Sequence, residues 1–249
     1  MRAEVEDWNQ ARDRYVEQFT RYRAWLGELL DHHYADNLDQ LSQDGMTGRI
    51  VGRTIWDLEN LMKWMDAPVP LVAYCVRSLL ELATILWSVE RRGDWLRWYG
   101  FAATDLIDCA RKSALQDPDS EDEGLRVVED LKQAYQKAGI DVPKEAEKTF
   151  AEAENGGYSS EYAETFKLLS KFVHPTPLVL FGPAGLYDND VFRRFFLMKS
   201  LKYLRTVYCL AAEQSGYNPA EIDVAGELAR LRAELAFSAE CTALGETSQ

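Results

Sequence analysis

The chain has 249 residues, of which 47% are hydrophobic and 28% charged, enough apolar material for one sizeable globular core. Its 41 acidic and 28 basic residues give a formal net charge of -13, which disfavours non-specific nucleic-acid binding because the field repels phosphate. RNA binding then needs a local basic groove. Two groups of basic residues could form one: Arg91, Arg92 and Arg97, or Arg193, Arg194, Lys199, Lys202 and Arg205.

Three sequence features predict a cytoplasmic protein without membrane contact. The N-terminal stretch MRAEVEDWNQ is charged and has no apolar run, so we expect no signal peptide. The 4 cysteines show no C-x-x-C spacing, which favours free thiols in a reducing compartment. The most apolar window, residues 70–87, approaches membrane-spanning length, but Arg77 and Glu81 lie at its centre and favour a soluble core helix.

Apolar residues recur with helical period along most of the chain. Gly93 is a stop signal, Ser120 and Glu123 have capping-box spacing, and Asn218 followed by Pro219 predicts the cap and first residue of the last helix. The pattern predicts helices at residues 4–33, 48–65, 70–92, 94–115, 120–138, 143–153, 160–174, 190–214 and 218–237.

The predicted fold class is all-α, because strand alternation never lasts long enough to build a sheet. We expect a single multi-helix bundle of about eight or nine helices. Residues 1–249 are expected to form one domain, since no long Pro/Gly/Ser linker divides them. The less hydrophobic region 116–158 is interpreted as a peripheral helical insertion, and 238–249 as a flexible tail.

The 70–92 helix is apolar nearly all round and carries one narrow polar stripe. Arg77, Glu81, Thr84 and Ser88 form this stripe, with spacings of helical period. Charges on a buried helix need partners, because an unpaired buried charge costs several kcal/mol. Either an Arg77–Glu81 pair fixes the helix in the bundle, or the stripe lines an internal polar pocket.

The later segment LLSKFVHPTP places Ser170 and His174 one turn apart, beside the apolar face of the 160–174 helix. His174 is the expected last helical residue, because the residue before a proline avoids the α region. It could cap the helix carbonyls and interact favourably with the negative, C-terminal end of the helix dipole. It could equally act as a general base or as a donor in a polar pocket.

The sequence predicts no metal and no cofactor. The stretch DHHYAD contains His32 and His33, but adjacent histidines on a helix point about 100° apart and make poor joint ligands. No Glu-x-x-His pair of the di-iron type occurs, FGPAG lacks the Lys-Ser/Thr of a P-loop, and GRIVG follows no strand.

Two segments together resemble a known family. RSLLELATILWSVERRGDWLRWYGF (77–101) and YAETFKLLSKFVHPTP (162–177) resemble a widespread bacterial family of all-helical proteins of unknown function. In that family an Arg-x-x-x-Glu helix precedes an aromatic, arginine-rich helix and a later Tyr…Ser-x-x-x-His-Pro segment. The family is similar to the HEPN helical-bundle superfamily. The resemblance covers residues 45–210 and implies a HEPN-like core with four signature positions: Arg77, Glu81, Ser170 and His174.

HEPN proteins are frequently metal-independent ribonucleases in toxin and phage-defence systems, with an Arg-x(4–6)-His motif in the active site. No Arg lies four to seven positions before a histidine in this chain, so Arg77 and His174 would have to meet from different helices. The resemblance then implies a ribonuclease or toxin effector in which His174 is the acid or base at the RNA 2′-hydroxyl and Arg77 stabilises the phosphate.

Two classes of function therefore stay open. The first is a binding or interaction module in a bacterial defence or stress system, whose polar network organises a surface for a protein partner or a small ligand. Self-association as a homodimer through the Trp-rich helices is compatible with either class. The alternative is the HEPN-like ribonuclease, with Arg77 and His174 as its active residues.

Overall fold

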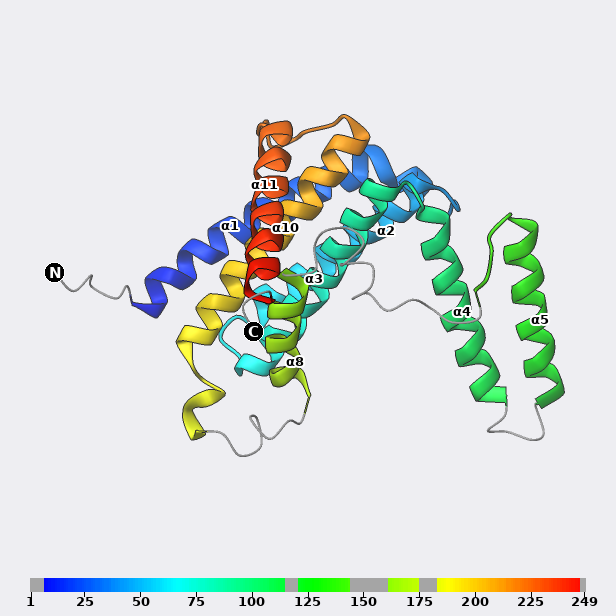
Figure 1. The fold of residues 1–249 in the computed structure, drawn as a ribbon, viewed down its shortest axis with the longest axis horizontal. Coiled ribbons are helices and arrows are strands. Elements are labelled where there is room, and N and C mark those ends of the chain that lie inside the picture. Colours follow the sequence, from blue (N-terminus) through cyan, green and yellow to red (C-terminus); the bar gives the residue numbers. More distant parts are fainter. Residues whose placement is uncertain (1–6, 115–120, 144–160, 175–182, 247–249) are drawn as a thin grey trace.

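The computed structural model describes residues 7–114, 121–143, 161–174 and 183–246, and every regular element in them is helical (Figure 1). The all-α prediction is confirmed: a helical bundle with one projecting helical hairpin. The elements are α1 (Trp8–Leu29), the π-helical η1 (Leu30–Tyr34), the 3-10 turn η2 (Ala35–Asn37), α2 (Gln43–Lys63), α3 (Val69–Arg92), α4 (Trp95–Ala114), α5 (Glu121–Lys137), the π-helical η3 (Tyr162–Phe166), α8 (Lys167–Val173), the 3-10 turn η4 (Ala184–Leu186), α10 (Asp190–Ser215) and α11 (Val224–Glu246).

The apolar helix α3 lies at the centre of the bundle and packs against α2, α8 and α10. Pro70 in its first turn favours helix initiation, and Gly93 ends the helix in the left-handed region with a φ of 66°. It is the only described helix that is long and apolar enough to cross a membrane. Because 56% of that apolar stretch is buried among the other helices, α3 is the core helix that the sequence predicted.

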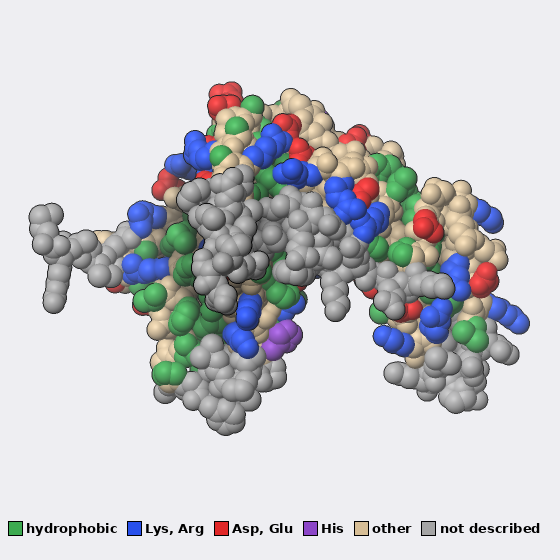
Figure 2. Space-filling view, viewed as in Figure 1, with side chains coloured by type: hydrophobic (Ala, Val, Ile, Leu, Met, Phe, Trp, Pro, Cys, Tyr) green, Lys and Arg blue, Asp and Glu red, His purple; other side chains and the backbone are tan. Residues whose placement is uncertain are grey.

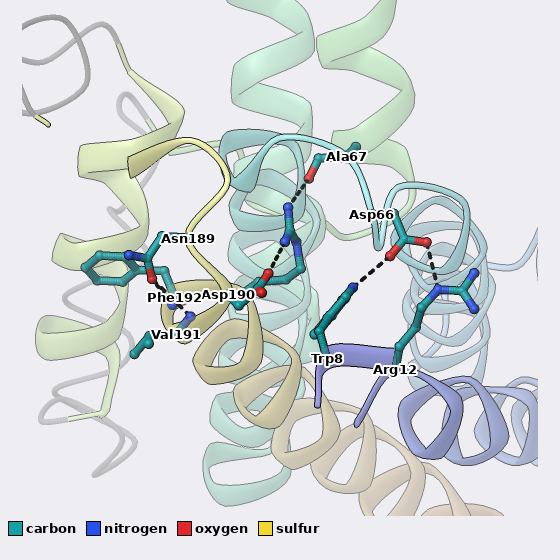
Figure 3. Close-up of polar contacts among 9 residues, drawn as sticks. Trp8, Arg12, Asp66, Ala67, Asn189, Asp190, Val191 and Phe192 are labelled. Atoms are coloured by element: carbon teal, nitrogen blue, oxygen red, sulfur yellow. Dashed lines mark hydrogen bonds and ion pairs between the residues drawn. The ribbon is translucent and has the colours of Figure 1, made fainter. Parts of the chain in front are cut away.

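A polar junction fixes the N-terminal end of α1 to the loop between α2 and α3 (Figure 3). Trp8 donates from its indole Nε1 to Asp66 at 3.1 Å, and Arg12 donates from Nε to the other oxygen of Asp66 at 2.7 Å. Beside them, the buried Arg193 of α10 donates to the carbonyl of Ala67 at 3.1 Å. The junction therefore joins three segments that are far apart in the chain.

Helix α2 begins five residues earlier than predicted, at Gln43. Its cap is Ser42, whose hydroxyl accepts a hydrogen bond from the amide of Gly45 at 3.0 Å. Gly48 lets this part of α2 approach η1 closely, because a Cβ there would lie 2.8 Å from the Cβ of Tyr34. Gly45 therefore supplies the capped amide, and Gly48 permits the close packing against η1.

The hairpin of α4 and α5 leaves the bundle after the corner at Gly93 (Figure 1). Helix α5 packs against α4, and α4 touches α2 near the corner. The segment after α5 returns to α4, where the hydroxyl of Thr104 donates to the carbonyl of Pro143 at 2.8 Å. Of the predicted insertion 116–158, the stretches 116–120 and 144–158 lie outside the described residues, which also exclude most of the predicted helix at 143–153.

The start of the last helix was predicted wrongly. Asn218 does not cap it: its side chain accepts from the Tyr208 hydroxyl at 2.6 Å and donates to the carbonyl of Ile222. Helix α11 starts at Val224, and Asp223 accepts a hydrogen bond from the amide of Gly226 at 2.9 Å. The tertiary contact with Tyr208 thus takes the side chain that the local pattern assigned to a cap. The helix also continues to Glu246, beyond the predicted end at 237.

Candidate functional site

Three of the four predicted site residues meet where α3 faces α8. Arg77 contacts Glu81 one turn along α3, with Nε 3.4 Å from Oε1. Its Nη1 lies 3.0 Å from Nε2 of His174, at the C-terminal end of α8. A guanidinium has donors only, so Nε2 of His174 accepts this hydrogen bond and carries no proton in this arrangement. The Arg77–His174 pairing brings together residues 97 positions apart.

Ser170, the fourth predicted residue, forms no side-chain hydrogen bond with the other three. Its backbone carbonyl accepts the His174 amide at 3.2 Å, so it helps to hold the last turn of α8. Its hydroxyl oxygen is buried and has no hydrogen-bond partner. His174 itself has left the helical region, with φ -97° and ψ 154°, as expected for a residue before proline. The position of His174 at the helix end is therefore compatible with its contact to Arg77.

An aromatic side chain supports the Arg77 guanidinium. Its central carbon lies 4.3 Å from the ring centroid of Phe166, which in turn stacks on Tyr162 at 4.6 Å. Both aromatic residues come from the π-helical turn η3, which the sequence did not predict. Such turns often occur at functional sites. Here the turn lies directly before α8, and one of its residues stacks on Arg77.

The cluster of Arg77, Glu81 and His174 is open to solvent. The side chains of Arg77 and Glu81 are 23% and 35% exposed to solvent, and His174 is exposed. Burial raises the pKa of Glu81 above its ordinary value, although Arg77 acts in the opposite direction. Glu81, at 3.4 Å, is the one acidic side chain of the described residues within ion-pair distance of Arg77.

The rest of the predicted polar stripe does not reach this cluster. Thr84 and Ser88 are buried, and the hydroxyl of Thr84 donates to the carbonyl of Leu80 on its own helix at 2.8 Å. The stripe therefore divides into a solvent-open half and a half that is enclosed in the core. An internal pocket lined by the whole stripe is not formed.

A buried carboxylate that the sequence analysis missed lies next to this cluster. Asp57 of α2 is fully buried and accepts from the Ser78 hydroxyl at 2.6 Å and from Arg53 Nε at 3.1 Å. Its other oxygen has no hydrogen-bond partner. The signal was present in the sequence, because Asp57 has helical spacing with the apolar residues Ile50 and Leu61 of α2.

A second polar network, around Glu161, was also missed. Glu161 is buried directly before η3 and accepts from four side chains: Lys199 at 2.7 Å, Lys202 at 2.9 Å, Tyr203 at 2.7 Å and Thr165 at 3.2 Å. Burial by itself would raise the pKa of Glu161, but the two lysine charges and their hydrogen bonds outweigh it and lower this pKa to about 2. This carboxylate is saturated with donors and closed to further ligands.

The basic residues that could have formed a nucleic-acid groove are largely engaged with acids. Basic and acidic side chains lie interspersed over the face shown in Figure 2. The ion pairs are Arg92 and Arg97 with Asp94, Arg193 with Asp190, Lys199 and Lys202 with Glu161, and Arg205 with Glu227. Within the described residues, these side chains therefore serve internal contacts.

The described part of the chain contains no group of three His, Cys, Asp or Glu side chains that could hold a metal ion. His32 and His33 instead pack on the ring of Tyr217, with centroids 5.4 and 4.6 Å away. Burial raises the pKa of the Cys75 thiol to about 12, so this cysteine is not an activated nucleophile.

Comparison with family models, with curated proteins and with solved structures gave no match to this chain.

Proposed function

We propose that the protein is a helical binding module whose Arg77–Glu81–His174 cluster receives an anionic group, a phosphate or carboxylate, of a ligand or protein partner. The observation that carries this proposal is a partly exposed guanidinium with a single acidic partner, Glu81 at 3.4 Å. Arg77 is held in place by Phe166 and His174, at 4.3 and 3.0 Å, and a positioned guanidinium binds anions with directed hydrogen bonds.

Calorimetric titration with inorganic phosphate and phenyl phosphate tests this proposal. Arg77→Gln should weaken binding by about tenfold or more, because a charge-assisted hydrogen bond is lost. Lys132→Gln, the same change of charge on the distant helix α5, is the matched control and should bind like the wild type. The proposal fails if the wild type binds neither anion at millimolar concentration, or if both variants behave alike.

The alternative function is a metal-independent ribonuclease of the HEPN type, and the 3.0 Å contact between Arg77 and His174 favours it. Nε2 of His174 would take the proton of the 2′-hydroxyl as that oxygen attacks the phosphorus, once Arg77 has left this nitrogen to contact the phosphate. Arg77 would stabilise the negative charge that develops on the phosphate oxygens. The bond to the 5′-oxygen would break as that oxygen takes a proton from water, leaving a cyclic phosphate and a 5′-hydroxyl.

Incubation with total RNA and tRNA at micromolar protein concentration separates the two functions. A ribonuclease loses cleavage in His174→Ala while its thermal unfolding stays close to that of the wild type. Intact RNA with the wild-type protein contradicts the ribonuclease and leaves the binding module. The resemblance to a bacterial family implies that either function belongs to a defence or stress system. Protection of cells against phage infection by the expressed protein would test this role.

A further inference from the structure

A second, mainly apolar pocket lies on a different part of the bundle, where α4 diverges from α2 and α3. Its volume is about 290 Å³. Its apolar lining includes Met46 and Ile50 of α2 with Leu82 and Ile85 of α3. The corner at Gly93 turns α4 away from the other two helices, and Trp98, Tyr99 and Ala102 of α4 complete the lining. The pocket does not share a lining residue with the Arg77 cluster.

One positive charge stands in the lining of this apolar pocket. Arg49 is exposed, and its Nε donates to the carbonyl of Leu38 at 2.7 Å. Its guanidinium lies 5.3 Å from the ring centroid of Tyr99, which also lines the pocket. Unlike Arg53 and Arg77, which each pair with an acid one turn away, Arg49 forms no ion pair with an acidic side chain of the described residues. Its two terminal nitrogens therefore remain available for an anion.

Two aromatic residues of α4, Tyr99 and Trp98, form the part of the lining next to Arg49. The Tyr99 hydroxyl lies 3.2 Å from the carbonyl oxygens of both Gln40 and Ser42, which fixes the ring beneath Arg49. The neighbouring Trp98 has its Nε1 shielded from solvent without any hydrogen-bond acceptor. Unpaired buried donors are uncommon in native proteins. The aromatic part of the lining is therefore anchored at Tyr99, through the backbone carbonyls of Gln40 and Ser42.

We infer that this pocket binds a small molecule with an apolar body and a single carboxylate. The body covers the aliphatic side chains of α2 and α3, and the carboxylate pairs with the terminal nitrogens of Arg49. Apolar pockets with a few positioned polar groups are the usual architecture of small-molecule sites. The volume suits a medium-chain fatty acid or an aromatic acid rather than a nucleotide, whose several phosphate charges would meet one arginine only.

Octanoate and 1-naphthoate are the probes, with octanol and 1-naphthalenemethanol as neutral counterparts. Calorimetric titration should show each acid binding with a Kd of about 1 mM or tighter, and each alcohol at least about tenfold more weakly, because it cannot form the charge-assisted pair. Absence of binding by both acids at millimolar concentration overturns the inference. Equal affinity of acid and alcohol overturns it as well.

Two variants locate the binding in this pocket. Arg49→Gln should weaken octanoate binding by about tenfold or more, whereas Lys63→Gln, the same change of charge at an exposed position of the same helix, should leave it unchanged. Ala102→Phe adds bulk at an exposed lining position and should abolish binding without disturbing the core. Thermal unfolding confirms that the variants fold. Wild-type affinity in folded Arg49→Gln or Ala102→Phe refutes the assignment.

Discussion

Two carboxylates, in the two polar clusters that η3 connects, behave in opposite ways. Glu161 is surrounded by four donors, including two lysines, and its pKa falls to about 2. Glu81 has one long contact, to Arg77, and burial raises its pKa. Residues of η3 take part in both clusters: Thr165 donates to Glu161, and Phe166 supports Arg77.

The difference lies in how completely each carboxylate is solvated by protein groups. A buried charge is stable when every lone pair has a donor, and such a network resists ligands because nothing is left to bind. The Arg77 cluster is under-satisfied and exposed, so an external anion could still improve its interactions. We therefore interpret the Glu161 network as architecture and the Arg77 cluster as the candidate site.

The largest expected difference is in the free energy of unfolding when each of the two glutamates is replaced by glutamine. Glu161→Gln should lower the free energy of unfolding by about 3 kcal/mol, because two lysines lose their buried counter-charge. Glu81→Gln should change it by less than about 1 kcal/mol, since its one ion pair is weak. Urea unfolding of both variants measures the contrast. Equal losses would show that the two carboxylates do not differ in this way.

The pH dependence of stability should have opposite signs at the two positions. The pKa of Glu161 is about 2 in the folded state and about 4.5 when unfolded, so the unfolded state binds more protons between these values. Its contribution, about 3 kcal/mol, is complete above pH 4.5 and is lost as the pH falls towards 2. The pKa of Glu81 is raised, so its ionisation makes the wild type less stable as the pH rises.

Urea unfolding from about pH 2.5 to 7 checks both signs against the two Gln variants. The stability advantage of the wild type over Glu161→Gln should grow with pH. The advantage over Glu81→Gln should shrink. Parallel curves for the two pairs would contradict the assigned pKa directions.

A smaller effect is expected for two hydroxyls near the clusters. Thr165→Ala removes a donor to Glu161 and should cost about 1 kcal/mol. Ser170→Ala removes a buried hydroxyl that has no partner and should change the stability by less than about 0.5 kcal/mol. Thermal unfolding distinguishes them. A larger loss in Ser170→Ala would place Ser170 in the hydrogen-bonded cluster after all.

A similarly small effect is expected for the coupling between Arg77 and His174. A double-mutant cycle of Arg77→Gln and His174→Ala should give a coupling energy of about 0.5–1 kcal/mol, because the two side chains share one exposed contact. The control cycle pairs Arg77→Gln with Lys132→Gln on α5 and should be additive. A coupling energy of zero in the first cycle would mean that the contact contributes nothing to stability.

Local patterns predicted most helices and part of the site. The polar stripe identified Arg77 and Glu81 as a pair one turn apart, and the Pro175 signal placed His174 at a helix end. Whether these two segments face each other could not follow from periodicity, which describes one helix at a time. The family resemblance joined them, and the fold places Arg77 and His174 in contact.

The missed residues share one physical reason. Asp57 and Glu161 look like ordinary helix acids in the sequence, and Lys199 and Lys202 look like a basic groove. Their roles depend on packing partners that lie up to 42 positions away in the chain. Asn218 likewise fits a cap until Tyr208 takes its side chain. Long-range contacts override local preference wherever a buried polar group requires a partner.

The sequence by itself determined the fold class, the apolar core helix and the positions of its charged residues, because hydrophobic periodicity and capping are local properties. Only the tertiary structure decided which charged side chains are paired within the fold and which remain available to a ligand. That decision depends on which donor side chains, from the same helix or from others, reach each carboxylate. Four reach Glu161 and close its network, while one reaches Glu81 and leaves Arg77 open to solvent.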